Sequence, residues 1–367
     1  MIMTIRRFCS PLLNKCRKAG KIHKGLLFIC MLAVLMTGCG YKASGDSREI
    51  RIGVCIYDEY DTFVSSITQY MKQWCQQKEK ETGDKYTLEI VSAKSSQLTQ
   101  NDQVEKFIAR NYDVLCINLV DRTDATLIID KAMDADVPIV FFNRELVEED
   151  LERWDKLYYV GAVAEQSGRL QADIILEDLM DEEEFNKIDV NHNGTIQYVI
   201  LEGEAGHQDA LVRTQVVTDE LTDAGISLEK LGDEYANWSK DQAKSKMKAL
   251  MESFPFQIEM VIANDDDMAL GALEALSEGN YPISPAVYGI NGTTEGLEAI
   301  RTMKLNGSVY NDAKGQADAI MEIACALGMD EAIPEDIELS FGKYVFLPYS
   351  RITYDNVQDY IKLRSNF

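Results

Sequence analysis

The chain has 367 residues, of which 37 are Lys or Arg and 61 are Asp or Glu, giving a formal net charge of −24 at pH 7. Such an acidic chain is a poor partner for nucleic acid or for an anionic membrane surface, because like charges repel. Its length suits two lobes of ordinary domain size.

The first 39 residues differ from the rest, because they hold seven Lys or Arg and no Asp or Glu. An apolar run over residues 25–40 follows this basic segment and contains Met-Thr-Gly-Cys at Met36–Cys39. The order is typical of a signal peptide, and the run is too short to span a bilayer comfortably. Its ending resembles a bacterial lipobox, which predicts cleavage before Cys39, a lipid on that cysteine and a polar tether over residues 40–49. An ordinary secretory signal with an incidental Cys39 is the alternative.

Short β-branched runs alternate with amphipathic stretches in the next part of the chain. Strands are predicted at 50–57, 86–93, 113–120 and 137–143, and helices at 63–81, 100–110 and 124–136. This alternation predicts βαβ units and a parallel, doubly wound sheet. In such sheets, ligands bind at the carboxyl ends of the strands.

The same pattern then restarts. A strand end and a long helix are predicted over 158–180, and strands at 196–203, 259–265, 286–292 and 307–312, with helices between them. The run at 343–354 contains Pro348 and is predicted to be a crossing segment rather than a central strand. The chain therefore has two similar halves, and no Pro- or Ser-rich linker separates them.

The cysteines do not predict a disulfide framework. Of the eight, four lie in the leader and four in apolar strand-like or helix-like segments, namely Cys55, Cys75, Cys116 and Cys325. We expect these last four to be small buried hydrophobic side chains. Only His192 and His207 follow the leader, and no CxxC pair is present, so a zinc site is not expected.

Residues 189–200 begin like a calcium-binding loop. Asp189, Asn191 and Asn193 stand at alternate positions and Gly194 follows, as in the first half of an EF-hand. The twelfth position, where an EF-hand has a bidentate Glu, is Ile200. A cation site here needs a carboxylate from elsewhere in the chain, and an Asx-rich turn without metal is the alternative.

Polar side chains follow six of the predicted strands. Among them are Asp61, Asn118, His207, Asp209, Arg213, Asp265, Asn291 and Asn311. A single Asx residue in such a place is usually a helix cap, but their recurrence predicts one cleft lined with amides, carboxylates and an Arg. This lining suits a neutral polyol, because planar polar groups bind adjacent hydroxyls while aromatic rings cover the C–H faces. Phe63 and Trp238 are the candidate rings.

Taken together, these segments resemble the galactose/glucose-binding proteins of sugar ABC transporters, which have the type I periplasmic-binding-protein fold. The resemblance runs from about Arg51 to the C-terminus and is carried, in order, by RIGVCIYDEYDTF, INLVDR, VPIVFFNRE, DKLYYVGA, DVNHNGTIQ, EAGHQDALVRT, IEMVIANDDDMALGALEAL and GSVYNDAKGQA. It implies an α/β fold of two lobes, each a doubly wound parallel sheet flanked by helices, joined by a hinge of three crossings. We expect these near residues 140, 311 and 347, with residues 50–140 plus 312–346 in the N-terminal lobe and 141–311 plus 347–367 in the C-terminal lobe.

The resemblance also completes the calcium loop. It implies that Ca²⁺ is held by Asp189, Asn191, Asn193, the backbone carbonyl of Thr195, Gln197 and, from a distant segment, Glu259. The ion would have a structural role, because it ties the loop to that segment. The family often has Asp where this chain has Asn193, so we expect weaker calcium binding than with three carboxylates.

For the sugar, the resemblance implies binding by Asp61, Phe63, Asn118, His207, Asp209, Arg213, Trp238, Asp265, Asn291 and Asn311. Phe63 and Trp238 would enclose the pyranose ring between them. The family usually has Asn where this chain has Asp265, and Asp where it has Asn291. D-galactose and D-glucose are the first choice; another aldohexose, a pentose or a hexose derivative is the alternative.

These observations predict a monomeric, lipid-anchored receptor outside the cytoplasm that delivers a monosaccharide to a membrane ABC permease, with a chemoreceptor as a further partner. A glycoside-acting enzyme is a second hypothesis, because paired carboxylates can cleave glycosidic bonds. Against it, the chain has no GxSxG, HExxH or phosphate-binding glycine loop. A sugar-responsive transcription regulator shares the fold but needs an N-terminal helix-turn-helix, where this chain has the leader.

Overall fold

The computed structural model describes residues 48–279, 281 and 283–365. The predicted leader, the lipidation site Cys39 and most of the tether lie outside these residues. Within the described part of the chain, no helix is both long enough and apolar enough to cross a membrane.

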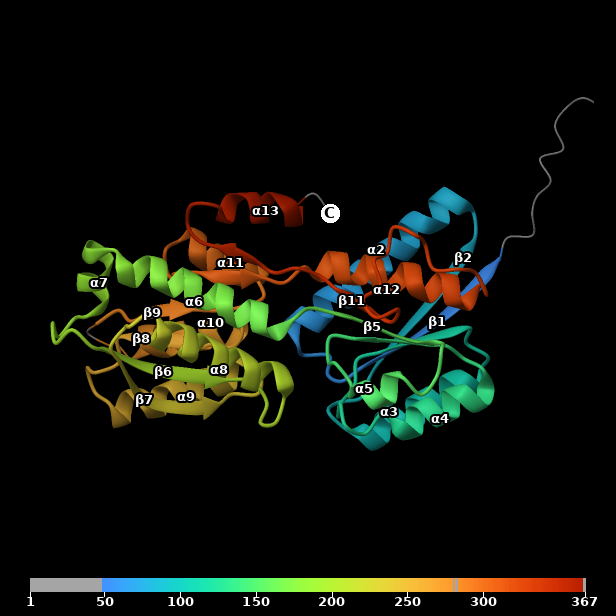
Figure 1. Cartoon of the computed structure of the whole chain (residues 1–367), viewed down its shortest axis with the longest axis horizontal. Coiled ribbons are helices and arrows are strands. Elements are labelled where there is room, and N and C mark those ends of the chain that lie inside the picture. Colours follow the sequence, from blue (N-terminus) through green and yellow to red (C-terminus); the bar gives the residue numbers. More distant parts are fainter. Residues whose placement is uncertain (1–47, 280, 282, 366–367) are drawn as a thin grey trace, which may run out of the picture. The chain divides into compact units, whose positions relative to one another are not determined.

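The N-terminal lobe is built on a six-stranded sheet with the strand order β11-β5-β4-β3-β1-β2. Figure 1 labels β1, β2, β5 and β11 of this sheet. All neighbouring strands in this sheet are parallel. The strands are β1 (Glu49–Ile56), β2 (Lys85–Ser92), β3 (Val114–Ile117), β4 (Ile139–Phe142), β5 (Leu157–Gly161) and β11 (Tyr344–Phe346). Strands β3 and β4 are buried along their whole length, as expected for a parallel sheet with helices on both faces.

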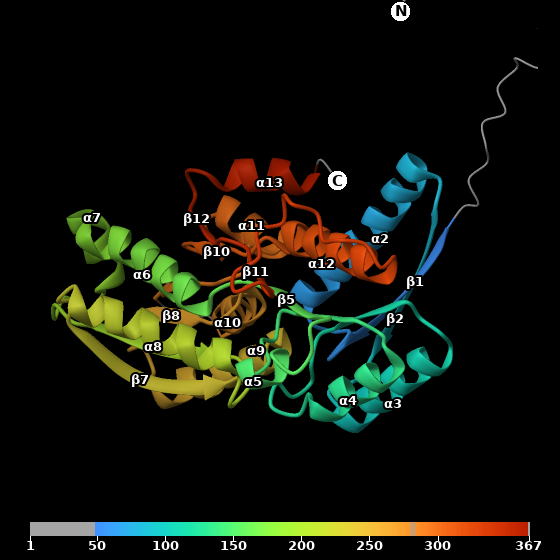
Figure 2. The same cartoon turned by 45° about the vertical axis from the view of Figure 1, so that its right-hand side comes forward.

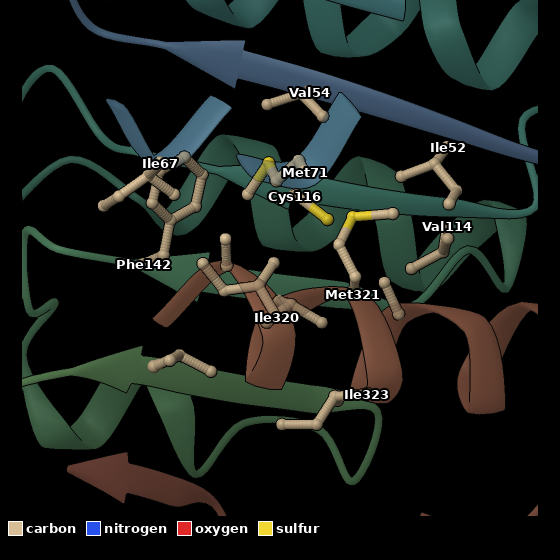
Figure 3. Close-up of a cluster of buried hydrophobic side chains, with 14 of the residues drawn as sticks. Ile52, Val54, Ile67, Met71, Val114, Cys116, Phe142, Ile320, Met321 and Ile323 are labelled. Carbon is tan, nitrogen blue, oxygen red and sulfur yellow. The ribbon is translucent and has the colours of Figure 1, made fainter. Parts of the chain in front are cut away.

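Helices from distant parts of the sequence cover this first sheet. They are α2 (Thr62–Thr82), α3 (Gln97–Ala109), α4 (Thr126–Ala135), the short α5 (Glu148–Leu151) and α12 (Ala313–Gly328). Met71 of α2, Cys116 of β3 and Met321 of α12 meet in one buried cluster (Figure 3). The four cysteines after the leader are free and buried, which confirms their predicted role as small hydrophobic side chains.

The C-terminal lobe contains a four-stranded parallel sheet with the order β7-β6-β8-β9 (Figure 1). Its elements are α6 (Ala164–Met180), α7 (Glu182–Ile188), β6 (Ile196–Glu202), α8 (Gln208–Asp223), β7 (Leu228–Tyr235), α9 (Lys240–Ser253), β8 (Met260–Ala263), α10 (Asp266–Glu278), β9 (Ala286–Tyr288), α11 (Thr294–Arg301), β10 (Ser308–Tyr310), β12 (Ser350–Ile352) and α13 (Val357–Ser365). Helices α6 and α8 pack on one face, and α9 and α10 on the other. Strand β10 pairs antiparallel with β12, and both are labelled in Figure 2. The predicted two-lobed α/β architecture is confirmed.

The chain passes between the two sheets at three places. Strand β5 pairs with β4 and β11, so the chain leaves the first sheet after Gly161 and not near residue 140, where the first crossing was expected. The expectation was wrong because β5, the last strand of the first sheet before the chain crosses, has the same short apolar pattern as a strand that begins a new sheet. The second passage lies between β10 and α12, and the third between β11 and β12, across Pro348.

Strand β7 has no counterpart among the expected elements. It carries Glu, Lys and Asp side chains, and most of its residues are exposed or half-buried. It is the edge strand of its sheet, where charged residues are favoured because they discourage pairing with other chains. These charges hide the alternation that would have marked it as a strand.

Candidate functional site

The carboxyl ends of strands from both lobes meet at one cavity. Nine of the ten residues predicted to bind a ligand line it, together with Asn143 and Arg144. The nine are Asp61, Phe63, His207, Asp209, Arg213, Trp238, Asp265, Asn291 and Asn311. About 30 Å³ of the cavity is open to the centres of water molecules.

The first lobe contributes Asp61 and Phe63 from the start of α2. Asp61 caps this helix by accepting a hydrogen bond from the backbone N–H of Val64 through Oδ1 (2.8 Å). Its other oxygen, Oδ2, accepts from the Tyr57 hydroxyl (2.6 Å). The carboxylate therefore has a fixed orientation at the cavity wall. Phe63, in the first turn of the same helix, is 5% exposed.

Asn118 is the one predicted ligand-binding residue that does not line the cavity. Its side chain is fully buried and accepts a hydrogen bond from the backbone N–H of Tyr57 (3.3 Å). It donates to the carbonyl of Phe142 (3.2 Å) and to Asn143 Oδ1 (3.0 Å). The hydrogen bond from Asn118 thus fixes the side chain of Asn143, and it is the Asn143 side chain that lines the cavity.

Sequence reasoning missed Asn143 and Arg144 as lining residues. Both follow β4, so they have the same sequence signal as the predicted residues, a polar side chain after a buried strand. Asn143 has a left-handed backbone with φ +62, which Asn tolerates better than most residues. Arg144 is 5% exposed and forms an ion pair with Glu204 of the second lobe, with 2.7 Å between Nη2 and Oε2.

Arg213 is the buried cation on the second lobe's side. Its guanidinium donates to Ser167 Oγ (3.1 Å), to the carbonyl of Asn264 (3.0 Å) and to the Tyr349 hydroxyl (3.0 Å). Asp209, one turn earlier on α8, lies 3.6 Å from Arg213 Nη2. Burial raises the pKa of the Asp209 carboxyl, and the positive charge of Arg213 opposes that rise.

His207 caps α8 and is held neutral. Burial lowers its pKa well below the usual value, and the positive charges of Arg144 and Arg213 lower it further. Its Nδ1 accepts a hydrogen bond from the backbone N–H of Asp209 (3.2 Å). The ring proton of a neutral imidazole then lies on Nε2, which makes His207 a hydrogen-bond donor toward a ligand.

Trp238 lies edge-on against His207, with 5.1 Å between the ring centroids and an interplanar angle of 76°. It and the preceding Asn237 both have left-handed backbones, with φ of +58 and +51. Such strained residues persist only where the surrounding structure holds them, and they cluster at ligand sites. The indole is thus held at the cavity by the fold rather than by local preference.

The two residues that depart from the family pattern lie at the same cavity. Asp265 caps α10 through Oδ1, which accepts from the backbone N–H of Met268 (2.8 Å). Burial raises the pKa of Asp265 well above its usual value, and the carboxylates of Asp267 and Asp61 raise it further. Asn291 accepts a hydrogen bond from Asn311 Nδ2 (3.3 Å).

The predicted calcium ligands come together at a second place, before β6. Asp189 accepts hydrogen bonds from the backbone N–H groups of Asn193 (3.2 Å) and Gly194 (2.8 Å). Gly194 has φ +75, so the sharp turn after Asn193 uses the conformational freedom of Gly. The side chains of Asn191 and Gln197 are adjacent, with 2.6 Å between Nδ2 and Oε1.

Glu259 reaches this loop from the start of β8. Its Oε1 accepts from the backbone N–H of Asn191 (3.2 Å) and its Oε2 from that of Gln197 (3.1 Å). Glu259 is 1% exposed and Asp189 is 3% exposed. Burial raises the pKa of Glu259, and the Asp189 carboxylate raises it further.

These residues fit a hard divalent cation. Neither Asp189 nor Glu259 has an ion-pair partner among the described residues, although both are nearly fully buried. In the described part of the chain no three His, Cys, Asp or Glu side chains gather as a metal cluster, so amide and backbone oxygens would have to complete the coordination. Asn191, Asn193, Gln197 and the Thr195 carbonyl are oxygen donors of the kind that Ca²⁺ accepts.

Comparison with known proteins places the chain among binding proteins. Residues 52–331 match the family described as periplasmic binding protein domain. The D-galactose/methyl-galactoside binding periplasmic protein MglB of Haemophilus influenzae is 33% identical over 325 residues, which cover 88% of this chain and 95% of that protein. A putative rhizopine-binding protein of Rhizobium meliloti is 32% identical over 282 residues, 76% of this chain and 84% of that protein.

A solved structure has the same fold. It is an ABC transporter solute binding protein from Bacillus halodurans with bound myo-inositol, 28% identical, with a TM-score of 0.71 over 86% of this chain and 99% of that chain. Because the family and these relatives are binding proteins, the prediction that the chain is not an enzyme is confirmed. The chain belongs to the periplasmic binding protein domain family.

Proposed function

We propose that this protein is an extracytoplasmic receptor for a neutral monosaccharide, with D-galactose or D-glucose as the first choice, and that it delivers the sugar to an ABC permease. One observation carries the proposal: nine side chains that the sequence predicts to bind a sugar, from strand ends of two lobes, line a single cavity. The Haemophilus relative is named for galactose and methyl-galactoside, and the Bacillus structure holds myo-inositol. Both names describe cyclic polyols.

The chemistry of the cavity suits such a ligand. Asp61, Asp209 and Asp265 supply oxygens that accept from hydroxyls, while Arg213 and neutral His207 supply donors. Asn291 and Asn311 can both donate and accept. Phe63 and Trp238 would cover the apolar faces of the ring. These faces are C–H surfaces, which pack against aromatic rings better than against polar groups.

Binding would require the lobes to separate. The residues that line the cavity come from both lobes, and Phe63, Arg213 and Asp265 are at most 5% exposed, so a sugar reaches them only when the lobes move apart. Three chain crossings allow a hinge motion in which the lobes open, admit the sugar and close over it. A permease that recognises surfaces of both lobes would then distinguish the closed form from the open one.

We also propose that Ca²⁺ binds at the 189–197 loop with Glu259 as the remote ligand. When bound, the ion would neutralise the two buried carboxylates and tie the loop to the start of β8, which stabilises the C-terminal lobe. Its role would be structural. The cavity and the loop are separate sites, since none of the calcium ligands lines the cavity.

The lipid anchor on Cys39 belongs to the same proposal, and the motif Met36–Cys39 supports it. A tethered receptor would stay close to its permease, which raises the effective concentration of one partner at the other. A role in chemosensory signalling is a further expectation that rests on the family resemblance.

The test is a calorimetric titration of the full chain, purified in detergent with excess calcium, with D-galactose and D-glucose. Saturable binding at micromolar or tighter levels that is lost in Trp238→Ala is the expected result. Trp154→Ala is the matched control, because Trp154 packs against the first lobe's core and does not line the cavity. Absence of binding by both hexoses and by a panel of pentoses, inositols and hexose derivatives would refute the proposal.

A further inference from the structure

A charged contact joins the two lobes beside the cavity. Arg144 follows β4 in the first lobe, and Glu204 follows β6 in the second. Arg144 Nη2 lies 2.7 Å from Glu204 Oε2; the Arg144 side chain is 5% exposed and that of Glu204 is 38% exposed. A pair between residues of different lobes can form only while the lobes are closed.

The first lobe holds Arg144 on two further sides. Its Nη1 donates to the carbonyl of Val120 (2.8 Å), and its Cζ lies 3.6 Å from the centroid of the Tyr57 ring. The Tyr57 hydroxyl in turn donates to Asp61 Oδ2 (2.6 Å). Arg144 therefore connects Glu204, through Tyr57, to a carboxylate at the cavity wall.

Glu204 is tied to the second lobe's part of the same wall. Its backbone carbonyl accepts a hydrogen bond from the backbone N–H of His207 (3.0 Å), across a turn in which Gly206 has φ +81. His207 lines the cavity and caps α8. The side chain of Glu204 itself does not line the cavity, so a change there leaves the ligand's direct contacts in place.

We infer that Glu204 is a positioning residue for the proposed monosaccharide site: its ion pair with Arg144 holds the lobes closed and, through Tyr57, fixes the Asp61 carboxylate. The inference rests on the proposed function. Removing one partner leaves a buried guanidinium without its counter-charge, which penalises the closed form. The open form does not contain the pair and loses nothing, so the effect falls on the rate of ligand dissociation.

The experiment compares Glu204→Gln with the wild-type full chain in detergent, using stopped-flow Trp fluorescence with the hexose that the wild-type protein binds. We expect the dissociation rate to rise about tenfold, less than for a fully buried pair because Glu204 is partly exposed, while the association rate stays within about twofold. Glu204→Asp keeps the charge and should recover part of the loss. Glu220→Gln is the control, because it removes an ion pair with Arg169 that lies within one lobe (3.2 Å).

Thermal unfolding of the sugar-free protein separates positioning from a general structural role. We expect the unfolding midpoint of Glu204→Gln to equal that of the wild type, because the pair is absent from the open form. An unchanged dissociation rate, or a rise equal to that in Glu220→Gln, would overturn the inference while leaving the proposed function intact. If the wild-type protein binds no neutral sugar, the proposed function fails and the inference fails with it.

Discussion

The indole of Trp238 lies directly against Gly203, so that a Cβ atom built on Gly203 would meet Trp238 Cζ2 at 2.1 Å. No real side chain tolerates this separation. Gly203 does not have a positive φ, so its backbone would accept Ala, and the effect of Gly203→Ala would come from the ring contact alone. The substitution should displace the indole from the cavity.

We expect Gly203→Ala to weaken sugar binding by roughly tenfold or more, since an aromatic contact and its apolar area are lost together. Calorimetry with the hexose measures this change. Gly328→Ala is the matched control, because a Cβ there meets its nearest neighbours at 3.3–3.4 Å, within the first lobe's core. Equal affinities for the wild type and Gly203→Ala would show that the indole does not contact the sugar.

Most of the cavity could be predicted from sequence because of a topological rule. In parallel sheets the carboxyl ends of all strands lie at one edge, so polar residues that follow separate strands are brought together. His207, Asp265 and Asn291 follow β6, β8 and β9, which are neighbours or near neighbours in one sheet. The rule says which residues share an edge, but it does not say which of them face the cavity.

Asn118 and Arg144 are two residues whose roles this rule does not predict. Asn118 follows β3 as the rule requires, yet its amide is used by Tyr57, Phe142 and Asn143. The pair of Arg144 and Glu204 joins segments 60 residues apart in different lobes. Neither the local spacing of residues nor hydrophobic periodicity predicts such a contact, because it depends on how the two lobes meet.

The calcium proposal predicts a loss of stability when the remote carboxylate is removed. Calcium should raise the unfolding temperature of the wild type. At a calcium concentration 100 times the dissociation constant, the free energy of unfolding should increase by about 2.7 kcal/mol. Glu259→Gln should abolish most of this gain, because Glu259 contributes one of the two charged ligands. Scanning calorimetry with calcium and with a chelator measures the difference. Glu220→Gln, far from the loop in sequence, should keep the full response; a calcium effect that survives in Glu259→Gln would contradict the site.

Asn193→Asp should strengthen calcium binding. Asn193 Oδ1 accepts a hydrogen bond from the backbone N–H of Thr195 (2.7 Å), and an Asp at this position can keep that bond while adding a negative charge. More charged ligands give tighter calcium sites, so we expect the dissociation constant to fall about tenfold. Isothermal titration of the chelator-treated protein provides the comparison. Equal or weaker binding by Asn193→Asp would show that residue 193 is not a ligand.

Buried carboxyl groups predict a stability that depends on pH. Burial raises the pKa of Asp266 to about 7, although Ser308 Oγ (2.6 Å) and the Thr293 N–H (2.7 Å) donate to it. Because its folded pKa lies above the unfolded one, the contribution is greatest at low pH and is lost as the pH rises toward 7. Between pH 5 and pH 8 the free energy of unfolding should therefore fall by roughly 2 to 3 kcal/mol from this residue.

Urea unfolding with excess calcium at each pH measures this slope. Asp266→Asn cannot ionise and should reduce this slope, whereas Asp233→Asn, at an exposed position on β7, should leave it unchanged. A slope that is the same in the wild type and in Asp266→Asn would mean that Asp266 has an ordinary pKa. Calcium is kept in excess because the proposed ligand Glu259, whose pKa is raised by burial, also binds a proton as the pH falls.

Asp265 offers a test of which sugar the cavity prefers. Its Oδ1 is committed to capping α10 through Met268, so Oδ2 is the atom left for a ligand. In Asp265→Asn the amide oxygen can keep the cap, and the remaining atom changes from a hydrogen-bond acceptor to a donor. A hydroxyl that donates to Asp265 would then meet another donor. Because a site built around one hydrogen-bond pattern rejects the opposite one strongly, we expect the ratio of affinities for D-galactose and D-glucose to change at least tenfold.

The measurement is a competition titration with the two hexoses on the wild type, on Asp265→Asn and on Asp265→Asn with Asn291→Asp. The double variant restores the arrangement that is usual in the galactose/glucose-binding family, so it should bind both hexoses even if the wild type prefers a different sugar. Calcium affinity serves as the control, because Asp265 is not among the proposed calcium ligands. If all three proteins give the same affinity ratio, Asp265 does not contact the hydroxyl at which the two hexoses differ, and discrimination between them must come from other residues of the cavity.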